Sequence, residues 1–174
     1  MHNEPKTGTI TKNELVIQKA YVNGKIFDVG GIGYEPKGEI KLAGEVIDPL
    51  NHPELIFAGK VAAFSANARI VFSEESQQLR VLGDPTEAAM RVFAEKIGFQ
   101  KDNLEQEAPK IGEIPFDYKT KYHATLHKVD GQNLLTVVGA PETVIGFSKK
   151  IWRDGKSFLL TEKEKQELET VFLG

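Results

Sequence analysis

The feature that most restricts the fold is a pair of turn dipeptides, Asn23-Gly24 and Asp130-Gly131, each set between runs of strand-forming residues. They divide residues 15–29 and residues 122–138 into two strands each. A two-residue type I′ turn needs positive φ at both central positions, which Asn-Gly and Asp-Gly tolerate. Both dipeptides therefore predict antiparallel hairpins, and such hairpins outnumber βαβ patterns. The predicted fold class is α+β, a mainly antiparallel twisted β-sheet with helices packed on it.

Further strands are predicted over residues 39–47 and 111–118, where apolar and β-branched residues recur. Between the first hairpin and residue 39 lies a loop rich in glycine and proline, residues 30–38. Its glycines permit backbone angles that other residues avoid. No strand-to-helix transition follows this loop, so a dinucleotide-binding fingerprint is a poor match. We interpret it as a strand connection.

The clearest helix is predicted to start at Asp84, which caps it, with Pro85 in the first helical position. Glu87 would complete a capping box, and Gly98 would end the helix. The other predicted helices begin after Pro53, run from Pro141 to about residue 150, and follow the cap Thr161, with Glu164 three residues on.

Composition excludes several classes of protein. The 174 residues fit one domain, and the absence of cysteine excludes disulfides and thiolate chemistry. The net charge is -3 with no basic stripe, so nucleic acid is not an expected partner. No apolar stretch approaches the ~18 residues of a spanning helix, and no direct membrane contact is expected. We expect this chain to be monomeric.

Five short segments, in this order along the chain, resemble the nucleotide-binding (N) domain of P-type cation-transporting ATPases of the calcium and sodium-potassium pump branch. They are residues 5–11 (PKTGTIT), 33–38 (GYEPKG), 83–89 (GDPTEAA), 115–117 (PFD) with Lys121, and 139–142 (GAPE). Each segment alone is a weak signal, whereas five in order at similar intervals are specific. The resemblance covers nearly the whole chain.

The resemblance implies residues 1–11 as a hinge or linker and residues 12–174 as the N domain. It implies ATP as ligand, Mg²⁺ in the parent protein, and the phosphorylation and actuator domains of the same parent chain as partners. The parent would be an ion-translocating ATPase, with this domain on the cytoplasmic face of the membrane. The chain alone is not expected to be catalytic, and no catalytic or metal-binding residue is assigned.

The resemblance also implies five nucleotide-binding residues: Glu87, Phe116, Lys121, Gly139 and Ala140. Phe116 would stack on adenine, Glu87 would accept a hydrogen bond from the adenine amino group, and Lys121 would face the phosphates or the ring edge. Gly139 and Ala140 would let the ligand approach the backbone. Structural alternatives stay open: a capping carboxylate for Glu87, a core ring for Phe116 and a solvated ammonium for Lys121.

The sequence departs from the family at two positions. The phosphorylated aspartate of the family falls at Pro5, which has no nucleophile. The family lysine before Gly-Ala-Pro-Glu falls at Val138. A hydrogen bond to a charged group is worth about 1.5–3 kcal/mol, so its loss predicts weak ATP binding, on the order of millimolar. The alternative is a degenerate regulatory or interaction domain that keeps the fold without nucleotide.

His123 and His127 lie on the same face of a predicted strand, four residues apart, and are candidate metal ligands. A zinc site needs at least three protein ligands. No third ligand is evident nearby, so a metal site is not predicted.

Overall fold

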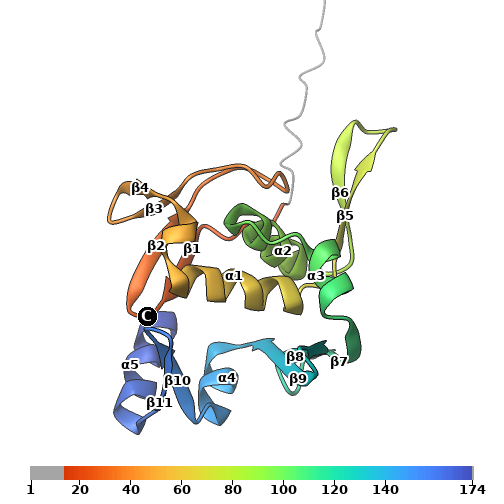
Figure 1. Ribbon diagram of the computed structural model, residues 1–174. Helices are drawn as coiled ribbons and strands as arrows, with labels where there is room; N and C mark the ends of the chain where they lie inside the picture. Colours follow the sequence, from red (N-terminus) through yellow and green to blue (C-terminus); the bar gives the residue numbers. More distant parts are fainter. Residues whose placement is uncertain (1–13, 174) are drawn as a thin grey trace, which may run out of the picture.

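The computed structural model describes residues 14–173, and α1 lies at the centre of the fold (Figure 1). The predicted hinge, residues 1–11 with Pro5, lies outside these described residues. Within them the helices are η1 (Pro49–Asn51), α1 (Pro53–Ser65), α2 (Pro85–Ile97), α3 (Lys101–Glu107), α4 (Pro141–Phe147) and α5 (Glu162–Leu173). The strands are β1 (Lys19–Val22), β2 (Lys25–Val29), β3 (Ile40–Leu42), β4 (Glu45–Ile47), β5 (Arg69–Ser73), β6 (Gln78–Leu82), β7 (Lys110–Asp117), β8 (Tyr122–Val129), β9 (Gln132–Gly139), β10 (Lys150–Arg153) and β11 (Lys156–Leu159).

The α+β class is confirmed, with every strand pair antiparallel among the described residues. The strands are divided over several sheets rather than joined in one. These are β1-β2-β3-β4, β7-β8-β9 and the two-stranded sheets β5-β6 and β10-β11. Figure 1 shows the β5-β6 hairpin extending away from the helices. Each sheet joins strands that are consecutive in sequence. Short turns connect them except between β2 and β3, which the glycine-rich loop connects.

Both predicted hairpins are confirmed by their backbone angles. Asn23 and Gly24 have φ of 51° and 74°, and Asp130 and Gly131 have φ of 49° and 78°. The single strand predicted over residues 39–47 is wrong, because Ala43-Gly44 turns the chain there between β3 and β4. The helix predicted to reach residue 150 ends at Phe147, and the β10-β11 hairpin that follows was missed.

Helix α2 begins and ends where the sequence predicts. The Asp84 side chain accepts hydrogen bonds from the backbone N–H groups of Thr86 and Glu87, and Gly98 ends the helix in the left-handed conformation. The capping box is not closed. The Glu87 carboxylate instead accepts from the backbone N–H of Asn67 at 2.6 Å. A contact 20 residues away in sequence has replaced the local one.

Helix α5 has the full capping box. The Thr161 N–H donates to Glu164 Oε2 at 2.9 Å, and the Glu164 N–H donates to Thr161 Oγ1 at 3.3 Å. Arg153 on β10 also donates to the Glu164 carboxylate. The hydrogen bond from Arg153, followed by those from Thr161, lowers the pKa of Glu164 to about 2. Glu164 therefore fixes both the helix start and the contact with β10.

Helix α1 packs against α2, and the main apolar core lies between these helices and the β1–β4 sheet. Its Gly59, an unfavourable residue inside a helix, has a packing reason. A Cβ at Gly59 would lie 2.9 Å from Ile97 Cδ1 of α2, so any larger residue would push the two helices apart. The close approach of α1 and α2 brings the start of α2 near the end of α1.

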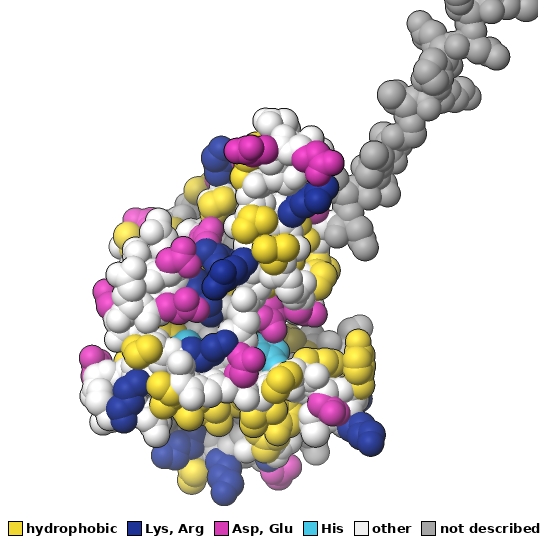
Figure 2. All heavy atoms as spheres, turned by 90° about the vertical axis from the view of Figure 1, so that its right-hand side faces the viewer, with side chains coloured by type: hydrophobic (Ala, Val, Ile, Leu, Met, Phe, Trp, Pro, Cys, Tyr) yellow, Lys and Arg dark blue, Asp and Glu magenta, His cyan; other side chains and the backbone are white. Residues whose placement is uncertain are grey.

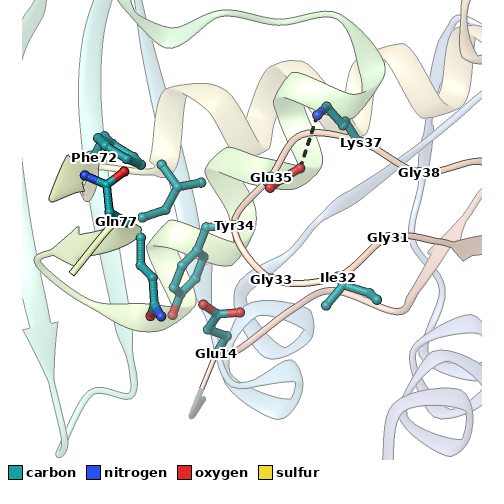
Figure 3. A pocket seen from close by; sticks show the side chains of 12 residues that line it. Glu14, Gly31, Ile32, Gly33, Tyr34, Glu35, Lys37, Gly38, Phe72 and Gln77 are labelled. Carbon is teal, nitrogen blue, oxygen red and sulfur yellow. Dashed lines mark ion pairs between the residues drawn. The ribbon is translucent and has the colours of Figure 1, made fainter. Parts of the chain in front are cut away.

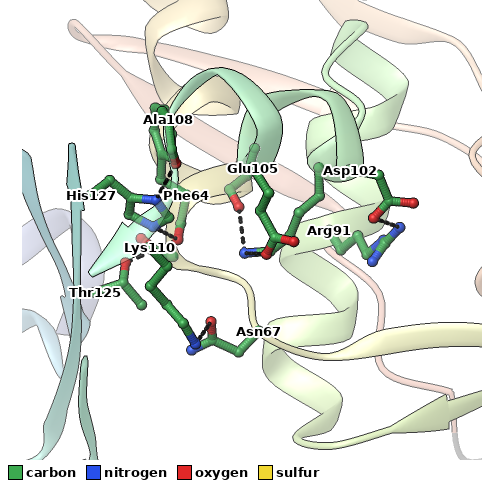
Figure 4. Close-up of polar contacts among 12 residues, drawn as sticks. Phe64, Asn67, Arg91, Asp102, Glu105, Ala108, Lys110, Thr125 and His127 are labelled. Atoms are coloured by element: carbon green, nitrogen blue, oxygen red, sulfur yellow. Dashed lines mark hydrogen bonds and ion pairs between the residues drawn. The ribbon is translucent and has the colours of Figure 1, made fainter. Parts of the chain in front are cut away.

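The end of α1 is held by side chains of β8 (Figure 4). Thr125 Oγ1 donates to the Phe64 carbonyl at 2.9 Å, and His127 places its two ring nitrogens 3.0 Å from the carbonyls of Phe64 and Ala108. His123 Nε2 lies 3.1 Å from the Ser65 carbonyl. These buried polar groups take up the free carbonyls that every helix end leaves. They fix β8, and the turn before it, relative to α1.

The other face of the β7-β8-β9 sheet carries exposed apolar side chains, among them Ile114 and Leu135. Figure 2 shows apolar side chains gathered in the lower half of this side of the molecule, at the height of β7–β9 in Figure 1. No helix within residues 14–173 has the length and apolar content needed to cross a membrane.

Candidate functional site

A hollow of about 410 Å³ lies where β7, β8 and β9 meet the start of α2, and we call it the Phe116 hollow. Its lining comes from residues far apart in sequence: Asp84, Thr86, Glu87, Phe116, Tyr118, Lys121, His123, Val138, Gly139 and Ala140. All five residues that the sequence singled out are in this set. The fold therefore brings the GDPTEAA, PFD and GAPE segments to one place.

Phe116 lies near the end of β7, where the pairing with β8 shifts register between Ile114 and Asp117. Bulges of this kind re-aim side chains. The Phe116 ring is 50% exposed, so it is not a core residue. Tyr118 meets it edge-on, with ring centroids 5.3 Å apart, and is itself 90% exposed. An open aromatic face of this type can stack on a flat ligand.

Lys121 ends the turn that follows β7. The Asp117 carboxylate accepts from the Lys119 N–H at 2.6 Å, and the Lys121 N–H donates to the Asp117 carbonyl at 2.7 Å. This tight turn puts Lys121 at φ 59°, in the left-handed region. The Lys121 ammonium is paired with Glu142 on α4 at 2.9 Å. The hydrogen bond from Lys121 lowers the pKa of the Glu142 carboxyl.

Glu87 lies in the first turn of α2, with one oxygen bound to the Asn67 N–H. A carboxylate has further acceptor positions on its second oxygen. The second oxygen can therefore accept from a ligand while the first holds the carboxylate in place. Asn67 is itself tied to β7, because Lys110 Nζ donates to its side-chain oxygen at 3.1 Å (Figure 4).

Gly139 and Ala140 end β9 and begin α4. A Cβ at Gly139 would lie 2.4 Å from the Lys121 carbonyl oxygen and 2.6 Å from Tyr122 Cβ. The direction of a Gly139 side chain is thus filled by the chain's own backbone. The Ala140 N–H donates to that same Lys121 carbonyl at 2.9 Å. Gly139 is required for the close approach of two strands at the edge of the hollow.

Comparison with known families identifies the domain. The sequence model of the P-type ATPase cytoplasmic domain N matches residues 55–172, which include all five predicted site residues. The chain belongs to this family of N domains. The resemblance read from the five short segments is therefore confirmed.

Similar curated proteins are much longer than this N domain. A calcium-transporting ATPase of Bacillus subtilis is 32% identical over 167 residues, covering 95% of this chain and 18% of that protein. A cation-transporting ATPase of Synechocystis is 34% identical over 148 residues, covering 80% of this chain and 16% of that protein. The calcium-transporting ATPase type 2C member 1 of Bos taurus is 28% identical over 165 residues. The chain spans less than a fifth of the relatives in the first two comparisons.

Apart from the helix cap Asp84 and the departure at Val138, sequence reasoning missed three residues of the Phe116 hollow as site residues: Thr86, Tyr118 and His123. Tyr118 follows Phe116 by two residues, and its place beside an aromatic residue was the available signal. His123 is buried at 7% exposure and lies against the end of α1, as described above. Within residues 14–173 no group of three or more His, Asp or Glu side chains could hold a metal ion.

Val138 lies in the Phe116 hollow and also packs against the main apolar core of the N domain. The resemblance has a lysine at this position. Where the family has an ammonium group, this chain therefore has an apolar side chain that packs against the core. Lys121 is the sole Lys or Arg among the described residues that line the hollow.

A larger hollow of about 730 Å³ lies between the glycine-rich loop and the β5-β6 hairpin, and we call it the loop hollow (Figure 3). None of the five predicted site residues lines it. A Cβ at Gly38 would lie 2.2 Å from the Gly30 carbonyl oxygen, so the loop folds closely on itself. Gly30 and Gly31 likewise face backbone oxygens at the end of the loop, which agrees with the interpretation of the loop as a strand connection.

Proposed function

We propose that this N domain binds the adenosine part of ATP in the Phe116 hollow. The observation that supports the proposal most is the convergence of Glu87, Phe116, Lys121 and the Gly139-Ala140 pair on one hollow with a half-exposed aromatic ring. The Phe116 face would stack on the purine, which is worth about 1–3 kcal/mol per base. The free oxygen of Glu87 would accept from the adenine amino group.

In the longer parent protein, the domain would present the γ-phosphate to the aspartate of a phosphorylation domain. Phosphoryl transfer depends mainly on alignment and on neutralisation of charge, so a domain that positions ATP contributes without a catalytic group of its own. The parent would be a P-type ion-translocating ATPase that carries a cation, with this domain on the cytoplasmic face. Phosphate oxygens suit Mg²⁺, which would enter with ATP.

The test is titration of ¹⁵N-labelled domain with ATP while the amide shifts are followed. We expect shifts clustered at residues 116–123 and 138–140, with an affinity on the order of millimolar because the family lysine is replaced by Val138. Phe116→Ala should abolish most of the response. The matched control is Phe72→Ala, since Phe72 is 57% exposed on β5 beside the loop hollow.

Val138 also supports a second candidate, a regulatory or interaction domain that keeps the fold without binding nucleotide. The same titration separates the two functions. Under this alternative neither ATP nor adenosine would shift the amides that surround the Phe116 hollow.

A further inference from the structure

The ion pair between Lys121 and Glu142 bears on the affinity of the proposed site. The two side chains are 55% and 42% exposed, and Nζ lies 2.9 Å from Oε1. Glu142 does not line the Phe116 hollow, whereas Lys121 does. Lys121 carries the single ammonium of the described lining that could bind a phosphate. The Glu142 carboxylate, which lies outside the lining, is paired with this ammonium.

The rest of the lining makes this ammonium more important. Asp84 and Glu87 are the acidic members of the set, and Val138 supplies no charge. With Lys121 neutralised by Glu142, the surroundings of a bound phosphate chain are net negative. Like charges at short range disfavour binding, even when salt weakens the interaction.

The backbone limits how Lys121 can respond. Its N–H is bonded to the Asp117 carbonyl, its own carbonyl accepts from Ala140, and its φ is 59°. A change of partner must therefore come from rotation of the side chain, with the Cα held in place. A lysine side chain has four rotatable bonds for such a movement.

We infer that Glu142 competes with the phosphate groups of the nucleotide for the Lys121 ammonium and so lowers the affinity for ATP. This inference rests on the proposed function and adds a regulating residue to it. Adenosine has no phosphate and does not compete with the carboxylate. Glu142 should therefore weaken the binding of ATP and leave the binding of adenosine unchanged.

The test compares Glu142→Gln with the parent domain by titration with ATP and with adenosine at low salt. Exposed ion pairs are weak, so we expect ATP to bind about two- to fivefold more tightly to E142Q. Adenosine affinity should stay the same. In the Lys121→Met background, E142Q should produce a clearly smaller gain, because there is no ammonium left to release.

The matched control is Glu162→Gln on α5. The exposed Glu162 carboxylate is paired with Lys165 at 3.1 Å, so the same charge is removed away from the hollow. E162Q should leave both affinities unchanged.

An equal gain in the Lys121→Met background would overturn the inference, since direct repulsion would then explain it. Unchanged ATP affinity in E142Q, or an equal gain for adenosine, would also overturn it while leaving the proposed function intact. Failure of both ligands to bind the parent domain and E142Q would remove the proposed function and the inference together.

Discussion

The Phe116 hollow and the loop hollow differ in size and in the way their lining is built. The loop hollow is larger, about 730 Å³ against about 410 Å³. Its glycine-rich loop folds back on itself at Gly31 and Gly38, and its ion pair, Lys37 with Glu35 at 3.3 Å, joins residues two apart in sequence. In the Phe116 hollow, Lys121 and Glu142 are 21 residues apart, and Glu87 is held by Asn67.

The predicted site residues therefore converge on the smaller of the two hollows, so volume alone is a poor guide to a candidate site. In the smaller hollow an open aromatic face lies beside a carboxylate and an ammonium, and the last two are each held by a contact between separate elements. Ligand sites typically place a few polar groups on an apolar lining. The following predictions test whether that difference has consequences for binding.

The largest effect is expected from the aromatic ring. Phe116→Ala removes the stacking surface and should weaken ATP binding by about tenfold or more, given a stacking contribution of about 1–3 kcal/mol. Phe72→Ala, beside the loop hollow, should leave the affinity unchanged. Isothermal or amide-shift titration measures both. An equal loss of ATP affinity in the two variants would show that the Phe116 hollow is not distinguished from the loop hollow in ATP binding.

A side chain added at a crowded glycine in either hollow should destabilise the domain, but only in the Phe116 hollow should it also affect ATP binding. Gly139→Ala and Gly38→Ala each place a Cβ against a carbonyl oxygen, at 2.4 Å and 2.2 Å. Overpacking of this kind costs about 1–3 kcal/mol, measurable by urea unfolding. Among the molecules that remain folded, only G139A should alter ATP affinity, because it displaces the carbonyl of Lys121. Normal ATP affinity in folded G139A would contradict the role of this contact.

Glu87→Gln should weaken ATP binding by about tenfold, since a lost hydrogen bond costs about 1.4 kcal/mol. Glutamine has one acceptor oxygen, which the Asn67 N–H would occupy, leaving an amide NH₂ group to face the donor NH₂ of adenine. Inosine triphosphate, which has a carbonyl there, should lose less. Titration of both nucleotides measures this, with Glu35→Gln as the control. An equal loss for the two nucleotides would argue against contact with the amino group.

The smallest expected effect is on the stability of the domain at acidic pH. The folded-state pKa of Glu142 is lowered by Lys121, so the pair contributes stability above the ordinary carboxyl value. This contribution should disappear as the pH falls through the lowered pKa. Urea midpoints of the parent domain and E142Q should therefore differ slightly at neutral pH and converge in acid. A difference that grows in acid would contradict the assignment.

Local features of this domain were predictable because their physics is local. Asn23-Gly24 and Asp130-Gly131 set their hairpins, and Asp84 and Gly98 set the ends of α2, through interactions within a few residues. Asp154-Gly155 carries the same signal for the β10-β11 hairpin, with φ of 47° and 81°. Ala43-Gly44 gave no such signal, since alanine does not favour positive φ.

The members of the candidate site were named through family resemblance, whereas their contacts required the coordinates. Glu87 fits a capping-box pattern in sequence. In the structure its carboxylate instead accepts a hydrogen bond from the Asn67 N–H, because α1 ends beside the first turn of α2. The burial of His123 and the edge-on contact of Tyr118 with Phe116 likewise depend on neighbours that the fold brings together.

The sequence by itself determined the hairpins at Asn23-Gly24 and Asp130-Gly131, the two ends of α2, the capping box of α5, the absence of cysteine chemistry and the membership of the N-domain family. These depend on neighbouring residues or on ordered motifs that can be read along the chain. Only the tertiary structure decided that Glu142 holds Lys121, that Asn67 holds Glu87 and that Gly139 must have no side chain. Each of these depends on contacts between segments that are separated in sequence. Pairing of β8 with β9 brings Lys121 to Gly139 and the start of α4, and packing of α1 against α2 brings Asn67 to Glu87.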